Sequence, residues 1–317
     1  MADTLTHDHH GHDHGHGHGL SLEDRHAHEA EIYDAMAVDL LATLGDDDLR
    51  VDPRQIPFHN REHVDYLSAA VRSIWPLEGK RVLEVGAGGG SLAVWLALQG
   101  AEVTGIDVSA GILDVARKRA AVSGVADRTR FVHAPIETYA VPEGEAPFDA
   151  IIGNNVVHHF ELDLAAANLR RLLAEDGTAV FCEPVLFLPE VVRTVRNSAP
   201  VARRFPLHTH TPDERSLSQA DLDVLGETFA SVTWSPFQVL CRLQNFVELS
   251  DPVWDRLERT DRWLLRRVPP TRRLCRMVVL ELSGTTPAAR AALAAHPTPT
   301  TDATPDPTPR HDEETDR

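Results

Sequence analysis

The middle of the chain alternates between short apolar runs and helical segments that end at a glycine. The apolar runs lack the polar alternation of a strand with one face in water, as expected for parallel strands covered on both faces. Strands are predicted at residues 81–85, 102–107, 129–133, 148–153 and 178–183, and helices at 92–98, 111–123 and 164–173. This alternation predicts an α/β fold with a doubly wound, Rossmann-like sheet.

Helical and strand patterns continue on both sides of this core. Ile32, Met36, Leu40 and Leu44 recur at four-residue steps and predict a helix over residues 22–44. The other predicted helices are 61–75, 189–197 and 219–229, the last capped by Ser218, with two helical pieces within 239–276 broken by Pro252 and by Pro269–Pro270. Late strands at 231–238 and 277–283 bring the predicted sheet to seven strands.

The two ends of the chain carry low-complexity sequence. Residues 1–22 include HDHHGHDHGHGHG, with seven His between His7 and His18, and residues 285–317 are rich in Pro, Thr and Asp. Neither end has the apolar periodicity of a folded segment, so both are expected to be disordered. Residues 23–284 then form one domain, divided into N-terminal helices (23–79), a central core (80–184) and a cap with the last strands (185–284).

The histidines of the leader are able to chelate a divalent metal such as Zn²⁺ or Ni²⁺, and the alternative is a hydrophilic leader without function. Within the domain, His59, Glu62 and His63 match an H-x-x-E-H metalloprotease pattern. We discount that match because no third ligand is suggested by any spacing, and we predict no metal site in the domain.

Composition narrows the class of protein. The chain has 317 residues, 42% of them hydrophobic, and a net charge of −17. So acidic a chain is not expected to bind nucleic acid, which requires a basic surface. The three cysteines do not suggest a disulfide or zinc framework. No apolar run is long enough to span a membrane and no signal-peptide pattern is present, so a cytoplasmic location is expected.

The most informative stretch is RVLEVGAGGGS, residues 81–91. Gly86, Gly88 and Gly90 follow an apolar strand where the chain must turn sharply and let a ligand approach bare backbone. The second strand ends in Asp107, 21 residues after Gly86, where an acid can accept hydrogen bonds from both ribose hydroxyls. The dinucleotide fingerprint would require a third small residue at position 91, which is Ser91.

The pattern Glu84-x-Gly86-x-Gly88-x-Gly90 resembles motif I of the class I S-adenosylmethionine (SAM) dependent methyltransferases. The likeness extends over residues 80–283 through KRVLEVGAGGGSLAVWLA, VTGIDVSAGILDVAR, FDAIIGNNVVHHF and Glu183-Pro184. It is greatest for the small-molecule group typified by ubiquinone and menaquinone biosynthesis methyltransferases. The resemblance implies a seven-stranded sheet whose last strand is antiparallel, SAM as cofactor, S-adenosylhomocysteine as product and a small-molecule acceptor.

The resemblance also implies roles for individual residues. Glu84 and the turn around Gly86, Ala87, Gly88 and Gly90 would hold the methionine part of SAM, and Asp107 would bind the ribose. The adenine would lie beside Val108, Ile112, Ala134, Pro135 and Ile136, and the amino-acid end beside Asn154 or Asn155. This sequence departs from its relatives after the third strand, because residues 133–136 contain no Asp to bind the adenine amino group.

Methyl transfer requires collinear nucleophile, methyl carbon and sulfur, and a hydroxyl or amine acceptor must also lose a proton. His158 and His159 follow the fourth strand, and we expect at least one of them to act as general base or to bind the acceptor. The alternative is that one caps the next helix while the other packs against the sheet. Glu183 is a weaker candidate.

Acceptor recognition is expected from the N-terminal helices and residues 184–276. Arginine pairs at 203–204, 266–267 and 272–273 indicate either an anionic acceptor or solvated helix faces. The aromatic residues Trp234, Phe237, Phe246, Trp254 and Trp263 line an aryl pocket or belong to the core. The oligomeric state is left open.

Three other functions compete with methyl transfer. The same fold can use SAM for decarboxylation or cyclisation. A nicotinamide oxidoreductase is disfavoured, because the third fingerprint glycine is absent and the only lysines, Lys80 and Lys118, form no Tyr-x-x-x-Lys pair. The last alternative is a metal-chelating protein that works through the His-rich leader.

Overall fold

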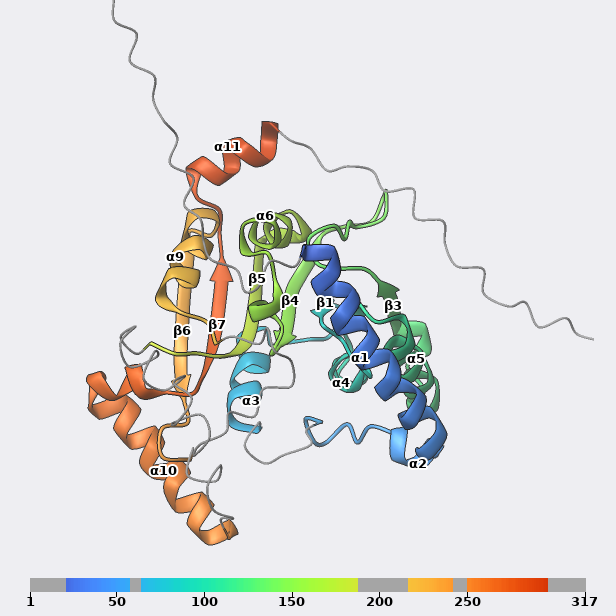
Figure 1. Cartoon of the computed structure of the whole chain (residues 1–317), viewed down its shortest axis with the longest axis horizontal. Coiled ribbons are helices and arrows are strands. Elements are labelled where there is room, and N and C mark those ends of the chain that lie inside the picture. The colour runs from blue at the N-terminus through green and yellow to red at the C-terminus, as the bar shows by residue number, and fades with distance from the viewer. Residues whose placement is uncertain (1–20, 58–63, 188–215, 242–249, 296–317) are drawn as a thin grey trace, which may run out of the picture.

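The computed structural model describes residues 21–57, 64–187, 216–241 and 250–295, which surround one seven-stranded sheet (Figure 1). The strands are β1 (Arg81–Val85), β2 (Glu102–Asp107), β3 (Thr129–His133), β4 (Phe148–Asn154), β5 (Leu173–Pro184), β6 (Ser231–Phe237) and β7 (Met277–Ser283). Their order is β3-β2-β1-β4-β5-β7-β6. Strands β1 to β5 are parallel, and β7 is antiparallel to both of its neighbours. The predicted fold class is confirmed.

The register of the parallel strands brings their carboxyl ends to one edge of the sheet. Val85 pairs with Ile106 on one side and with Gly153 on the other. Asp107 and Asn154 therefore leave the sheet on either side of the glycine turn that follows β1. Open α/β sheets bind ligands at this edge.

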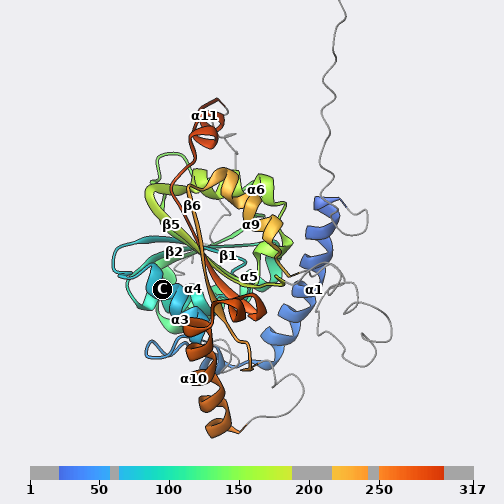
Figure 2. The same ribbon diagram turned by 90° about the vertical axis from the view of Figure 1, so that its left-hand side faces the viewer.

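Helices cover both faces of the sheet (Figures 1 and 2). α3 (Val64–Ser73), α4 (Ser91–Leu98) and α5 (Ala110–Ser123) share one apolar cluster with alternate strand residues such as Val82, Val103 and Ile152. α6 (Leu162–Leu172) and α9 (Gln219–Thr228) pack with the other set, including Leu83, Ile151 and Phe181. All residues of α4 from 92 to 97 are buried, which explains why this helix is apolar on every side.

A third layer is formed by α1 (Leu22–Thr43) and the short α2 (Asp46–Leu49), which pack on the outer side of α5. The predicted apolar face of α1 is partly wrong, because Met36 is 45% exposed and Ala37 is the buried residue. Steps of four residues advance by 400°, so a row at strict four-residue spacing drifts around the helix by 40° per step. Ala37 contributes instead with Tyr33, Leu40 and Leu44.

The low-complexity ends need two corrections. The helix predicted from Leu22 is confirmed, because Ser21 and Asp24 form a capping box there, so the disordered leader expected over residues 1–22 is wrong at Leu22. Residues 287–295 of the expected disordered tail form α11 (Pro287–Ala295). This helix begins with proline, is rich in alanine, and has the Thr286 hydroxyl accepting the Ala289 N–H.

The cap contains α10 (Asp251–Arg267) and the 3₁₀ helix η6 (Pro269–Leu274). Pro252 lies in the first turn of α10, where proline is tolerated, rather than breaking a helix. Two further 3₁₀ turns are η3 (Ala126–Arg128) and η4 (Val157–His159). None of the described helices is long and apolar enough to cross a membrane. The predictions for the His-rich tract, His59, Glu62, His63, 189–197, the arginines at 203–204, Phe246 and the remainder of the tail lie outside the described residues.

Asp34 fastens α1 to α5, and its loss is expected to weaken that docking. The Asp34 carboxylate accepts the Ser109 hydroxyl at 2.5 Å and the Gly111 N–H at 2.9 Å, at the N-terminus of α5. Asp34→Ala should lower the free energy of unfolding by about 1–2 kcal/mol. Urea unfolding measures this, and Asp39→Ala on the exposed side of α1 is the control, expected within about 0.5 kcal/mol of wild type. Equal losses in the two variants would contradict the anchoring role.

Candidate functional site

The glycine turn after β1 uses its glycines for different reasons. Gly86, Gly88 and Gly90 have φ of 68°, 48° and 73°, in the left-handed region that favours glycine. A Cβ on Gly86 would lie 2.7 Å from Val156, and one on Gly90 would lie 2.6 Å from the Ala116 side chain. A Cβ on Gly88 would meet nothing within 4 Å. Gly86 and Gly90 therefore permit close packing, whereas Gly88 leaves space beside bare backbone.

Asp107 is fixed against this turn. Its Oδ2 accepts the Gly88 N–H and its Oδ1 accepts the Ser109 N–H, both at 2.9 Å. Burial raises the pKa of the Asp107 carboxyl, although these backbone hydrogen bonds oppose the shift. The side chain lines the pocket at the carboxyl edge of the sheet. An ionised Asp107 keeps lone pairs for a further donor on the pocket side.

Glu84 lies beneath the turn rather than in the pocket. It is 5% exposed, and its carboxylate accepts the Ala93 N–H in the first turn of α4. Burial raises the pKa of Glu84 well above its ordinary value, and nearby Asp107 adds to the rise. The Oε2 atom is buried and has no hydrogen-bond partner among the described residues. Glu84 therefore supports the turn and leaves one acceptor unsatisfied.

The pocket is formed by the ends of β1 and β2, the segments that follow β3 and β4, and α1. The predicted residues that line it are Gly86, Asp107, Val108, Ala134, Pro135, Ile136 and His159. It also includes residues that were not predicted, namely His26, Glu29, Val85, Ile106, Glu137, Val156 and Phe160. The predicted residues outside this lining are Glu84, Ala87, Gly88, Gly90, Ile112, Asn154, Asn155 and His158.

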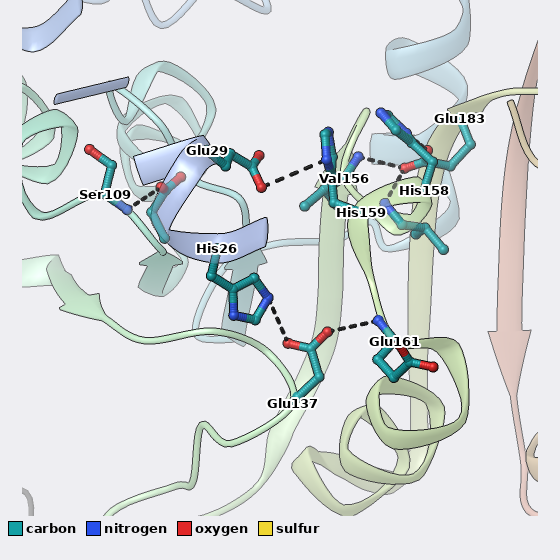
Figure 3. Close-up of polar contacts among 11 residues, drawn as sticks. His26, Glu29, Ser109, Glu137, Val156, His158, His159, Glu161 and Glu183 are labelled. Carbon is teal, nitrogen blue, oxygen red and sulfur yellow. Dashed lines mark hydrogen bonds and ion pairs between the residues drawn. The ribbon is translucent and has the colours of Figure 1, made fainter. Parts of the chain in front are cut away.

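The two adjacent histidines have different surroundings. His158 is 4% exposed, and its Nδ1 lies 2.8 Å from Oε2 of Glu183. The Oε1 atom of Glu183 accepts the N–H groups of Val156 and Val157 at 2.8 and 2.9 Å (Figure 3). Fully buried Glu183 therefore shapes the loop after β4, and His158 is part of that support.

His159, by contrast, lines the pocket. Its Nδ1 lies 3.7 Å from Oε2 of Glu29 on α1, and the two side chains are 21% and 18% exposed (Figure 3). The pair joins segments that are far apart in the sequence. A carboxylate beside Nδ1 favours the tautomer that carries its proton there and leaves Nε2 able to accept one.

Glu137 is a pocket residue that the sequence reasoning missed. Its side chain is 2% exposed, Oε1 accepts the Glu161 N–H at 3.0 Å, and Oε2 lies 3.6 Å from Nε2 of His26 (Figure 3). Oε2 has no hydrogen-bond partner among the described residues. Burial lowers the pKa of His26, against the attraction of Glu137. The available signal was that Glu137 is the next residue after the adenine segment 134–136.

Three buried oxygens near this edge have no hydrogen-bond partner among the described residues: Oε2 of Glu84, Oε2 of Glu137 and Oδ1 of Asn154. Buried acceptors without donors are costly. Of these three residues only Glu137 lines the pocket, so its oxygen is the one that a bound ligand with N–H groups satisfies there. SAM carries an ammonium group, an adenine amino group and a sulfonium charge. Its chemistry therefore fits both the donor requirement and the carboxylates at this edge.

Residues 82–177 match a family described as a methyltransferase domain. A ubiquinone biosynthesis O-methyltransferase of Xylella fastidiosa (strain 9a5c) is 35% identical over 159 residues, which cover 49% of this chain and 62% of that protein. The protein of the same name from Ruegeria sp. (strain TM1040) is 33% identical over 171 residues, covering 50% of this chain and 68% of that protein. The chain thus spans less than two thirds of the first relative and slightly more of the second.

A solved structure supports the fold. Geranyl diphosphate C-methyltransferase from Streptomyces coelicolor A3(2), in complex with Mg²⁺, geranyl diphosphate and S-adenosyl-L-homocysteine, has a TM-score of 0.50 to this chain. It is 14% identical, and the match covers 82% of this chain and 97% of that chain. At this identity the likeness concerns the fold alone.

A methyl group on Gly88 is expected to obstruct SAM while leaving the protein folded. Gly88→Ala should cost about 1–2 kcal/mol of stability, because the residue has positive φ but open space around the new Cβ. Its dissociation constant for SAM, measured by calorimetry, should rise at least about tenfold. Gly124→Ala, at φ 75° with equally open surroundings, is the matched control and should bind SAM normally. Unchanged SAM affinity in Gly88→Ala would refute this role for the open side of the turn.

The raised pKa of Glu84 predicts a pH dependence of stability. Unfolded Glu84 loses its proton near the ordinary value of 4.5, while the folded protein retains it to higher pH. Its contribution to stability is therefore complete below about pH 4.5 and declines as pH rises, by up to about 1.4 kcal/mol per unit. Glu84→Gln should remove this decline, so its advantage over wild type should grow between about pH 5 and pH 7 in urea unfolding. Glu102→Gln, at an exposed position on β2, controls for the loss of one carboxylate. A stability advantage of Glu84→Gln over wild type that became smaller as pH rose would contradict the prediction.

Proposed function

Because this chain belongs to the class I SAM-dependent methyltransferases, we propose that it transfers the methyl group of SAM to a small molecule of the quinone or hydroxylated aromatic type. The observation that carries the proposal is the pocket at the carboxyl edge of the sheet, which is lined by Asp107, held by Gly88, and by His159. Relatives named ubiquinone biosynthesis O-methyltransferase support the acceptor class.

We assign the cofactor to this pocket and to the unsatisfied acceptors in it and beside it. Asp107 binds the ribose hydroxyls, with two of its oxygen lone pairs already directed by the backbone. Glu137 Oε2 accepts the adenine amino group, which supplies the acid that the sequence lacks at positions 133–136. Asn154, at the end of β4 and outside the lining of the pocket, would accept the ammonium group at Oδ1 beside the glycine turn. Bound in this way, SAM supplies an electrophilic methyl group.

The protein's contribution to the chemistry is to position the acceptor and remove its proton. Holding the reacting atoms in line can account for about 7–11 kcal/mol of the barrier. His159 takes the proton of the acceptor hydroxyl at Nε2, because Glu29 lies near Nδ1 on the other side of the ring. Glu183 and His158 do not contact the acceptor; they contribute indirectly, because they fix the loop that carries His159. The N-terminal helices and the cap, residues 23–79 and 185–284, contribute the acceptor side.

The proposal is tested by methyl transfer itself. Purified full-length protein is incubated with methyl-labelled SAM and a panel of catechols, hydroxyquinones and hydroxybenzoates. The expected result is a labelled acceptor with one equivalent of S-adenosylhomocysteine. Consumption of SAM without S-adenosylhomocysteine would indicate decarboxylation or cyclisation instead, and tight binding of NADH with none of SAM would overturn the proposal.

Substitution of His159 should affect catalysis, whereas substitution of His158 should affect stability. His159→Gln is expected to lower kcat about 10²–10⁴-fold with little change in the SAM dissociation constant, because it removes a base. His158→Gln is expected to lower stability by about 3 kcal/mol, because it breaks a buried pair with Glu183. Kinetics with the best acceptor and urea unfolding measure the two effects. Full activity in His159→Gln would exclude His159 as the base. Glu29→Gln should shift the pH profile of kcat only if Glu29 orients His159.

A further inference from the structure

The outward face of α10 concentrates positive charge on an acidic protein. Arg256, Arg259, Trp263, Arg266 and Arg267 are exposed and, at 100° per residue, fall within an arc of about 100° on the helix. The adjoining η6 adds exposed Arg272 and Arg273. The whole chain has 48 acidic and 31 basic residues. This face is therefore positively charged although the chain as a whole carries a net negative charge.

Within the part of the chain that the structure describes, neighbouring acids form no ion pair with these arginines. Among the described residues, no ion pair is formed by Arg256, Arg259, Arg266, Arg267 or Arg273. The nearest paired arginine is at the side of the helix, where Arg262 contacts Glu258 at 3.7 Å and Asp65 at 3.9 Å. A solvated face on an acidic protein would be expected to mix both signs of charge. This face instead presents one sign.

The opposite face of α10 holds the helix rigidly on the cap. Trp254 and Leu265 are buried there, and the Asp261 carboxylate accepts the N–H groups of Val239, Leu240 and Cys241 at 2.7–3.0 Å. Arg272 ties η6 back by donating to the Leu265 carbonyl at 2.9 Å. The arginine face is thus presented on an anchored helix about 25 Å long, which projects from the body of the protein (Figures 1 and 2).

Exposed apolar groups accompany the charge. Trp263 is 58% exposed, Leu274 46% and Val253 45%, among the largest exposures of apolar side chains in the described residues. Tryptophan flanked by arginines is typical of a surface that lies in the headgroup region of a bilayer, where the ring is half in hydrocarbon and the guanidinium groups contact phosphate.

We propose that the outward face of α10, together with η6, docks on the surface of a bilayer that contains anionic phospholipid. A flat anionic surface would contact this projecting helix, and salt screens the repulsion of acidic groups that lie more than a Debye length, about 10 Å, from that surface. A nucleic acid would need a positive path along the protein, which a net charge of −17 does not offer. None of this face lines the pocket, so the inference does not depend on the proposed acceptor.

The test is co-sedimentation of the full-length protein with vesicles of phosphatidylcholine alone and of phosphatidylcholine containing about one third phosphatidylglycerol. Binding is expected only to the anionic vesicles and should weaken as salt is raised. The triple variant Arg259→Gln, Arg266→Gln, Arg267→Gln should bind on the order of 100-fold less, at about fivefold per arginine. The triple variant Arg54→Gln, Arg72→Gln, Arg128→Gln removes three other exposed arginines and should bind like wild type.

Tryptophan fluorescence gives a second measurement. Anionic vesicles should shift the emission of the wild type to the blue, and Trp263→Phe should lose that shift. Circular dichroism establishes that each variant is folded, and thermal shift with SAM establishes that the pocket is intact. Equal binding to neutral vesicles, equal losses in the two triple variants, or binding to a nucleic acid with none to anionic vesicles would each overturn the proposal.

Discussion

The shape of the pocket depends on one buried carboxylate, that of Glu183 at the end of β5. The chain leaves β4 through Asn155, whose φ is 54°, and the next backbone N–H groups find no strand partner. Buried N–H groups without acceptors would destabilise the loop. Glu183 accepts two of them and bonds His158 with its other oxygen, so its own burial is compensated. The loop thereby holds Val156, His159 and Phe160 at the pocket.

The same arrangement recurs along the carboxyl edge of the sheet. Asp107, Glu84 and Glu137 each accept a backbone N–H from a neighbouring loop or helix end. A parallel sheet gathers its loops at this edge, and short acidic side chains satisfy them without filling the space between strands. The result is a concentration of carboxyl oxygens, although burial raises the pKa of Glu84 and Asp107 and so opposes their negative charge. Such a pocket favours a ligand that carries positive charge and N–H donors, and both are properties of SAM.

Local features of the sequence predicted most of the fold. The strand periods, the glycine stops and the spacing of Asp107 from Gly86 are short-range signals. The observed strands agree with the predicted ones within one residue, except that β5 begins at Leu173 and not at residue 178. The predicted pocket residues that line it likewise lie directly after strands β1 to β4. The failures have other causes. α11 was missed because its alanines, which favour a helix, lie within a proline-rich tail. The buried face of α1 was missed in part because it follows the 3.6-residue helical period and not steps of four residues.

Long-range contacts account for what the sequence could not show. His158 and His159 are adjacent and chemically identical, yet only the fold decides that one faces Glu183 and the other the pocket. The α1 residues His26 and Glu29 have no motif, and they enter the site because the fold brings them against Glu137 and His159 in the lining of the pocket.

This position of α1 couples two equilibria. The C-terminal half of α1 is fixed to α5 by Asp34 and an apolar contact. In its N-terminal half, His26 and Glu29 line the pocket, and Arg25 pairs with Glu161 at 2.8 Å outside that lining. A ligand that binds only when α1 is docked stabilises the docked helix by mass action. Cofactor affinity and the stability of α1 would then be linked, and Asp34, which does not line the pocket, would contribute to both.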